Sequence, residues 1–235
     1  LETIETQDSA APFHDWNERI NAECYSVNAA SRILDGKDRI LAIVNNYSRM
    51  SFNFGPTLLS WMEKQDPDTY RAILESDKES RDRFSGHGNA LAQVFNHIIM
   101  PLVNLADKRT QVYWGVKDFE RRFGRRPEGM WLAETAVDLE TLEVLAEEGI
   151  QFTILSPHQA HRIRPRQGEK WQKIGDGGID TSCAYRQVLP SGKSISLFFY
   201  NGTVARAVAF EGLLRRAEYL VDRLLGAFQA GSERV

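Results

Sequence analysis

The feature that most constrains the fold is a short apolar run, an amphipathic helix and a second apolar run in direct succession. The first run is GMWLAE at 129–134 and the second is QFTILSP at 151–157, both with the composition of buried strands. Between them Leu139, Leu142 and Leu145 repeat at helical spacing. Two strands joined by a helix in this way pair in parallel, and helices cover a parallel sheet. The sequence therefore predicts an α/β fold.

Further strands and amphipathic helices alternate along the rest of the chain. The residue patterns predict strands at 38–47, 48–55 and 194–202, and helices at 56–65, 66–86, 108–124 and 209–228. The helix at 66–86 carries so many charges that we expect most of its length to face solvent. This alternation is typical of a doubly wound sheet or a barrel, and 235 residues are enough for one such core. We therefore expect a single domain over residues 1–235.

The composition argues against several classes of function. The chain is 42% hydrophobic and 26% charged, and it has no apolar run long enough to span a membrane. A net charge of −3 and a pI near 6.0 give no reason to expect a nucleic-acid partner. Cys24 and Cys183 are too few for a disulfide framework, so we expect two packed, reduced thiols in a cytoplasmic protein.

A carboxylate and an aromatic side chain stand at the end of the predicted strand 129–134. In α/β folds the chemistry gathers at the carboxyl ends of the strands, where Glu134 falls. The N–H groups of a helix that starts beside it would favour the ionised carboxylate that a nucleophile requires. Trp131 adds a flat apolar face of the kind that stacks on sugar rings. The alternative interpretation of Glu134 is a charge that complements the helix end, and spacing alone favours this alternative.

Histidine and asparagine side chains form a second candidate group. The segment SGHGNALAQVFNHIIMPL, residues 85–102, contains His87, Asn89, Asn96 and His97. Such side chains can hold sugar hydroxyls by hydrogen bonds, whereas a hydrogen-bonded position in a loop or core is their more common role. The segment is therefore compatible with both a sugar site and an ordinary loop.

Two other segments have an ordinary interpretation beside a functional one. HDWNERINAEC at 14–24 places Trp16 among polar groups with weak periodicity, which suits either a loop lining a pocket or a surface helix. HQAH at 158–161 has a spacing that metals use, but it is followed by the basic stretch RIRPRQ and accompanied by no cysteine or third histidine. We therefore expect a surface loop there rather than a metal site.

Several segments together resemble one known family. GMWLAETAVD is similar to the nucleophile motif of glycoside hydrolase family 57, in which a Trp and two further residues precede the catalytic Glu. DWNERINAECY, MSFNFGPTLLSWME, FNHIIMPL and WGVKDFERRFGRRPEGMW also resemble its uncharacterised bacterial subgroup of α-amylase/α-mannosidase-like proteins. The family contains α-amylases, 4-α-glucanotransferases and branching enzymes. Because the similarity runs over nearly the whole chain, it is more specific than the short motif alone.

The resemblance implies an incomplete (β/α)7 TIM-like barrel of parallel strands with outer helices. It further implies a glycoside hydrolase or glucanotransferase that acts on an α-glucan or oligosaccharide with retention and needs no metal or other cofactor. Retention requires two carboxyl groups ~5–5.5 Å apart, one as nucleophile and one as general acid. The family's double-displacement mechanism is therefore the chemistry that we expect.

The same resemblance assigns roles to individual residues. Glu134 matches the nucleophile position, Trp131 matches the aromatic residue of the motif, and His97 matches a His-Pro-Leu-type motif near the sugar site. The complete set of candidates for sugar contacts is Trp131, His97, Trp16, His87 and Asn89.

Two signatures of the family have no counterpart in this sequence. A His-x-His pair followed by Gln-Pro should precede Leu1, and the acid/base aspartate, in an Asp-Gly-Glu-like stretch, should follow Val235. Neither Asp176 nor Asp180 has a matching context. We therefore expect the sequence to be the middle of a catalytic domain, truncated at both ends and inactive in isolation.

Two alternatives compete with this enzyme. One is a catalytically silent carbohydrate-binding relative or fragment, which would show affinity for sugar without release of reducing ends. The other is a metal-dependent carbohydrate deacetylase, which metal analysis would identify. The scarcity of His/Asp ligand clusters in the sequence counts against this second alternative.

Overall fold

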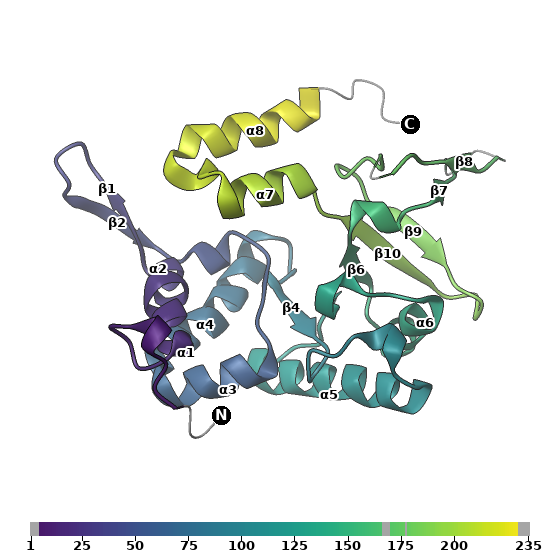
Figure 1. Cartoon of the computed structure of the whole chain (residues 1–235), viewed down its shortest axis with the longest axis horizontal. Helices are drawn as coiled ribbons and strands as arrows, with labels where there is room; N and C mark the ends of the chain where they lie inside the picture. Colours follow the sequence, from purple (N-terminus) through teal and green to yellow (C-terminus); the bar gives the residue numbers. More distant parts are fainter. Residues whose placement is uncertain (1–4, 166–169, 177, 230–235) are drawn as a thin grey trace. The chain divides into compact units, whose positions relative to one another are not determined.

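The structure, a computed structural model, describes residues 5–165, 170–176 and 178–229 (Figure 1). These residues form two compact units. The first unit runs to residue 133 except for residues 99–102, which belong with the second unit. None of the helices within the described ranges is long and apolar enough to cross a bilayer.

The first unit begins with short helical segments and a hairpin. These are η1 (Asp8–Ala10), α1 (Trp16–Ile20), the π-helix η2 (Asn21–Tyr25), α2 (Ser26–Ala29), β1 (Ser31–Leu34), β2 (Ile40–Val44) and η3 (Asn46–Ser48). β1 and β2 pair antiparallel, and Figure 1 shows them projecting from α2. The strand predicted at 38–47 is therefore confirmed over β2, but it forms half of an exposed hairpin whose first strand was not predicted.

A three-stranded parallel sheet follows, in the order β3–β4–β5. Its strands are β3 (Phe52–Asn53), β4 (Ala90–Gln93) and β5 (Met130–Trp131), and its connecting helices are α3 (Pro56–Gln65), α4 (Pro67–Arg83) and α5 (Leu105–Phe123). The predicted α/β fold with parallel strands and helices is thus confirmed. The strands predicted at 48–55 and 129–134 are only two residues long, because hydrogen bonding covers only part of each apolar run.

Helices α3 and α5 follow from local signals in their sequences. Pro56 occupies the first turn of α3, where its missing N–H costs no hydrogen bond, and Leu59 and Met62 are buried on one face. α5 is capped at its start by Asn104, whose side chain accepts a hydrogen bond from the N–H of Asp107. It ends at Gly124, which has the left-handed φ of 66° that a glycine C-cap supplies.

Helix α4 is more buried than its charge suggests. The prediction that most of its length faces solvent is wrong for one complete face, on which Tyr70, Ile73 and Asp77 are buried. This face carries a carboxylate because Asp77 has a partner inside the unit, the guanidinium of Arg125. Apart from Arg81, which is half-buried, the remaining charges of α4 are exposed.

An aromatic cluster fills part of the core of the first unit. Phe52 of β3 lies with its ring centroid 5.0 Å from Tyr47, 5.7 Å from Phe54 and 6.4 Å from Phe123. Such tilted and edge-on pairs add to the apolar burial that holds a sheet against its helices. Through Phe123 the cluster joins β3 to α5.

The second unit contains a mixed sheet and several helices. Its elements are η4 (Met100–Leu102), η5 (Ala133–Thr135), α6 (Leu139–Glu147), β6 (Phe152–Leu155), η6 (Pro157–Gln159), β7 (Arg162–Ile163), β8 (Gln172–Lys173), β9 (Tyr185–Val188), β10 (Ser194–Phe199), α7 (Gly202–Phe210), η7 (Leu213–Arg215) and α8 (Ala217–Gln229). β10 pairs in parallel with β6 and antiparallel with β9. Within the described residues no sheet closes on itself, so completeness of the barrel stays a prediction.

Two expectations for the second half of the chain and the cysteines need correction. The helix predicted at 209–228 begins only at Ala217 as α8, because Gly212, with a φ of 69°, turns the chain between the end of α7 at Phe210 and α8. The two cysteines, Cys24 and Cys183, are free and exposed, not packed. Part of the basic stretch after HQAH, at 166 and 167, lies outside the described residues, as do 1–4 and 230–235.

Candidate active site

Glu134 lies on a strained turn directly after strand β5. Leu132 and Ala133 are buried, whereas the side chain of Glu134 is exposed. Glu134 has φ 54° and ψ 20°, and the next residue, Thr135, has a φ of 55°. Left-handed backbone is uncommon outside glycine and is a clear outlier for a β-branched residue such as threonine. Consecutive residues of this kind persist only when their surroundings impose them, and such strain is concentrated at active sites.

The helix that follows does not begin beside Glu134. Helix α6 starts at Leu139 and is capped by Asp138, whose carboxylate accepts hydrogen bonds from the N–H of Thr141 at 2.7 Å and from its hydroxyl at 2.6 Å. The acidic residue in the first turn of α6 is Glu140. The helix therefore begins five residues after Glu134 and not directly beside it, and an effect of its N–H groups on this carboxylate stays a prediction.

The turn is held from one side by the segment after β6. The backbone carbonyl of Thr135 accepts a hydrogen bond of 2.8 Å from the side-chain amide of Gln159. The Oε1 atom of Gln159 accepts a second bond of 2.7 Å from the N–H of Ser156, which closes a capping box around η6. Because both ends of the amide are occupied, Gln159 is fixed and can in turn fix the carbonyl that follows Glu134.

A row of side chains crosses the carboxyl edge of the parallel sheet in the first unit. Gln93, the last residue of β4, is in register with Trp131, the last residue of β5. The amide of Gln93 also donates a hydrogen bond to Asn53 Oδ1 at the end of β3. Carboxyl ends of parallel strands are where α/β folds place their ligands. Asn53 and Gln93 were missed by sequence reasoning, although their position as the last residue of an apolar strand is a usable signal.

His97 lies on the loop that leaves this edge. It comes four residues after Gln93, is exposed, and has a φ of 48°. The loop is tied to α5 through Gln111, whose side-chain oxygen accepts the N–H of Asn96 at 2.8 Å and whose backbone carbonyl accepts the N–H of Phe95 at 3.2 Å. The chain thus places His97 on the same side of the sheet as Trp131.

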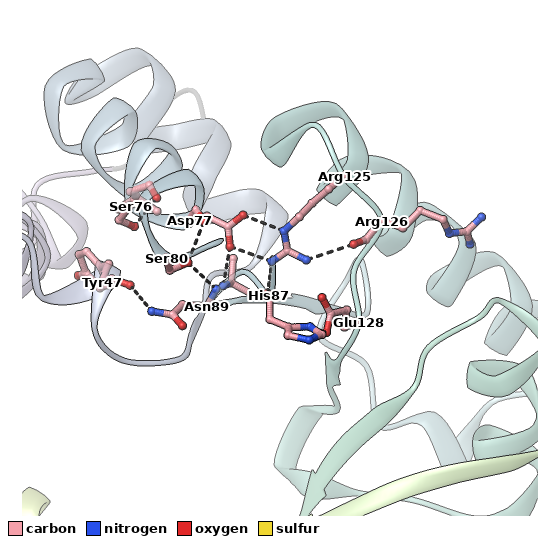
Figure 2. Close-up of polar contacts among 11 residues, drawn as sticks. Tyr47, Ser76, Asp77, Ser80, His87, Asn89, Arg125, Arg126 and Glu128 are labelled. Carbon is pink, nitrogen blue, oxygen red and sulfur yellow. Dashed lines mark hydrogen bonds and ion pairs between the residues drawn. The ribbon is translucent and has the colours of Figure 1, made fainter. Parts of the chain in front are cut away.

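His87 and Asn89 lie at the amino ends of the parallel strands, away from the carboxyl ends. Both precede β4, and His87 Nδ1 contacts Oε2 of Glu128, which precedes β5, at 2.8 Å. Figure 2 shows His87 beside Glu128. Asn89 is buried, with its side-chain amide donating to the carbonyl of Tyr47 at 3.1 Å and its N–H donating to Ser80 Oγ at 2.9 Å. The structure therefore separates these two residues from the carboxyl edge, and a sugar contact by either stays a prediction without geometric support.

Trp16 lies on a helix and not on a loop. It begins α1, which Asp15 caps by accepting the N–H of Asn17 at 2.8 Å. The indole Nε1 donates to Ser9 Oγ at 2.9 Å, and the guanidinium of Arg19 lies 4.9 Å from the centroid of the ring. The surface-helix interpretation of this segment is thus confirmed, while a sugar contact by Trp16 stays a prediction.

The possible metal ligands of the described residues have local roles. One group of three, His14, Asp15 and Glu18, has ligand atoms within 4.8 Å of one another. Its central carboxylate already caps α1 and contacts His14 Nδ1 at 2.9 Å, and this hydrogen bond from His14 lowers the pKa of Asp15. In the HQAH segment, His158 pairs with Asp176 at 2.7 Å on the exposed surface, as expected of a surface loop.

The sequence profile of glycosyl hydrolase family 57 matches residues 13–234. Alpha-amylase 1 of Dictyoglomus thermophilum is 27% identical over 106 residues, which are 45% of this chain and 15% of that protein. The chain therefore spans a small part of the length of this relative.

Solved structures agree in fold. The exo-type maltose-forming amylase from Pyrococcus sp. ST04 matches 92% of this chain and 38% of its own with a TM-score of 0.58. The 4-α-glucanotransferase from Thermococcus litoralis matches 79% of this chain and 31% of its own with a TM-score of 0.54. Both are 16% identical in sequence, so they demonstrate a common fold, and the chain spans about a third of each.

Proposed function

Because this chain belongs to glycosyl hydrolase family 57, we propose that it cleaves or transfers α-glycosidic bonds of glucans by double displacement, with Glu134 as the nucleophile. The observation that carries the assignment is the turn after β5, where an exposed carboxylate stands on two consecutive left-handed residues. Strain held by the surrounding residues is what fixes a reacting group in place before the substrate arrives.

The reaction then proceeds in two displacements. A carboxylate oxygen of Glu134 attacks the anomeric carbon, the glycosidic bond breaks, and the leaving oxygen takes a proton from a second carboxyl group. This gives a glycosyl ester on Glu134. The second group then removes a proton from water or from a sugar hydroxyl, which attacks the same carbon and releases Glu134. Water gives hydrolysis and a hydroxyl gives transfer. We assign the role of acid/base to none of the aspartates in residues 1–235, because none of them has the sequence context of the family's acid/base residue.

The carboxyl edge of the first unit supplies groups for sugar binding. Trp131 offers an aromatic face to the apolar side of a sugar ring. The amides of Asn53 and Gln93, already hydrogen bonded to each other, have further donors and acceptors for hydroxyl groups. We propose these three residues and His97 as the contacts of one bound sugar.

Chemical rescue tests the role of Glu134. In the complete protein, Glu134→Gln should lower turnover of an α-glucan by roughly 1000-fold or more while affinity for the sugar is largely kept. Glu134→Gly, supplied with azide and an α-glucosyl fluoride, should release a glucosyl azide of inverted configuration, because azide takes the vacated position and fluoride leaves without protonation. Glu140→Gln, which makes the same charge change in the first turn of α6, is the control and should keep turnover.

Three outcomes would contradict the proposal. Undiminished turnover by Glu134→Gln would remove Glu134 from the mechanism. Affinity of the complete, unaltered protein for glucans without release of reducing ends would identify a binding protein instead. Release of acetate that depends on an added metal ion would identify a carbohydrate deacetylase.

A further inference from the structure

A groove lies between α3 and α5 in the first unit. Its volume is about 560 Å³, within the range of about 300–1,000 Å³ that small-molecule sites occupy. The lining includes polar side chains from both helices and two aromatic side chains: Thr57, Ser60, Gln65, Asp118, Trp61 and Phe95. This groove contains none of the residues discussed so far for catalysis.

A buried arginine holds the polar wall of the groove in place. The side chain of Arg122 is 1% exposed, and its Nε donates to both carboxylate oxygens of Asp118 at 3.0 and 2.9 Å. Its Nη2 donates to Ser60 Oγ at 2.8 Å, so the hydroxyl proton of Ser60 can be donated elsewhere. Ser60 and Asp118 come from different helices and are set in position with no ligand present. Side chains that bind a ligand precisely are held in position by hydrogen bonds of this kind from a buried neighbour.

Aromatic rings form the other wall. Phe95 meets Trp114 edge-on, with centroids 5.5 Å apart and planes at 77°. Trp61 is buried, whereas 48% of Trp114 is exposed. About half of the Trp114 side chain is therefore accessible to a ligand beside Phe95. Trp61 and Phe95 line the groove, and Trp114, which is not part of the lining, extends the apolar surface from Phe95 along α5.

The charge of the groove points to a neutral ligand. The carboxylate of Asp118 is already compensated by Arg122, and the lining carries one lysine, Lys64. A phosphorylated or otherwise polyanionic ligand would require several cations. Aromatic faces together with hydroxyl, amide and carboxylate groups match a sugar, which has an apolar ring face and a rim of hydroxyls.

The groove starts next to the carboxyl edge of the sheet. Pro56 follows Asn53 by three residues, and Phe95 follows Gln93 by two. A chain segment of two residues spans at most ~7 Å and one of three residues at most ~11 Å. A glucan held by the row of Asn53, Gln93 and Trp131 can therefore reach the groove within a few sugar units.

We propose that this groove binds the remote part of a glucan chain and makes the protein prefer long substrates. The sugar class rests on the proposed function, whereas the groove, its preformed polar wall and its exposed tryptophan are independent of it. Phe95 and Trp114 provide the apolar contacts, and Ser60 and Asp118 bind hydroxyl groups.

Native electrophoresis in gels containing glycogen tests the proposal, since retardation measures binding without any turnover. Phe95→Ala and Trp114→Ala should each weaken retardation roughly fivefold or more. Tyr113→Ala is the matched control, because Tyr113 lies next to Trp114 on α5 and is 47% exposed, and its retardation should not change. Maltoheptaose should displace the protein from glycogen at lower concentration than maltotriose. Thermal unfolding of each variant shows that it is folded, and Phe95→Leu replaces Phe95→Ala if the latter is not.

The outcomes separate this inference from the proposed function. The proposal of a glucan-binding groove is contradicted if folded Phe95 and Trp114 variants are retarded as strongly as the unaltered protein. It is also contradicted if the unaltered protein is not retarded at all. Both conclusions hold whether or not the protein cleaves glucans. Loss of turnover without loss of retardation in Glu134→Gln supports both. Retardation that depends on Trp114, found in a complete protein that does not turn over glucans, supports the groove and contradicts the catalytic proposal.

Discussion

The carboxylate of Asp77 receives two parallel hydrogen bonds from the guanidinium of Arg125, Nε to Oδ2 and Nη2 to Oδ1, each 2.8 Å long (Figure 2). The side chain of Asp77 is 1% exposed and that of Arg125 is 11% exposed. Asp77 Oδ1 also accepts the N–H of Ala90, and Arg125 Nη2 donates to the carbonyl of Ala90. The pair therefore clamps both backbone groups of the first residue of β4. The strand whose last residue is Gln93 is thus anchored at its other end by a buried ion pair.

Removing one member of this pair should destabilise the protein strongly. Asp77→Ala leaves the guanidinium of Arg125 buried without its counter-charge, which costs about 3–5 kcal/mol in the free energy of unfolding. Asp68→Ala is the control, because Asp68 pairs with Arg71 on the exposed face of the same helix, and it should change stability little. Urea unfolding followed by circular dichroism measures both, and equal losses in the two variants would contradict the role of the clamp.

Close approach of α5 to β4 leads to a second prediction. A Cβ atom on Gly115 would lie 2.1 Å from the backbone carbonyl oxygen of Gln93, and a backbone atom cannot move aside cheaply. Gly115→Ala should therefore lower the free energy of unfolding by about 1–3 kcal/mol, despite a gain of ~1 kcal/mol in helix propensity. Gly36→Ala, in open space, should be nearly neutral. Thermal unfolding distinguishes them, and a stabilised Gly115→Ala would show that α5 lies further from the sheet.

The sequence predicts the helices better than the strands, and the reason is local. Pro56 and Gly124 mark helix ends by their own backbone preferences, so α3 and the end of α5 were predictable. Gly212 interrupts a continuing apolar pattern, and only its left-handed φ shows that the helix ends there. The strands β3 and β5 shrink to two residues because their length is set by their neighbours in the sheet.

Part of the site depends on contacts that no local pattern contains. The position of Glu134 at a strand end was predictable, but the left-handed turn is held by Gln159, which lies 24 residues beyond Thr135. His87 and His97 are ten residues apart in sequence, yet β4 runs between them and carries them to opposite edges of the sheet. Their closeness in sequence led to the prediction of one shared site, whereas strand β4 places them at opposite ends of the sheet.

The backbone at Glu134 can be tested apart from its chemistry. At a φ of 54°, glycine avoids the steric penalty that alanine incurs, so Glu134→Gly should be more stable than Glu134→Ala by about 1 kcal/mol. At Glu140, in the first turn of α6, the order should reverse, with alanine more stable than glycine by up to ~1 kcal/mol. Chemical unfolding of the four variants measures both differences. The same order at both positions would mean that Glu134 is not held in the left-handed region.

Asp66 should make stability depend on pH in the acidic range. Its Oδ1 caps α4 by accepting the N–H of Thr69 at 3.1 Å, and its Oδ2 accepts from Asn21 Nδ2 at 2.7 Å. Burial acts to raise the pKa of this carboxyl, but the hydrogen bonds from Asn21 and Thr69 outweigh it and lower the pKa below its ordinary value of 3.8. The folded state therefore binds this proton more weakly than the unfolded state does. The stabilisation is fully present above the ordinary value and is lost as pH falls through the lowered pKa.

Asp66→Asn isolates this contribution, because asparagine also caps helices but does not titrate in this range. The unfolding free energy of the unaltered protein minus that of Asp66→Asn should be constant above about pH 5 and should fall toward more acidic pH. Urea titrations between about pH 3 and pH 7 give this difference, in which the other carboxylates cancel. A difference that stays constant over the whole range, or that grows as pH falls, would show that the hydrogen bonds from Asn21 and Thr69 do not favour the ionised form of Asp66.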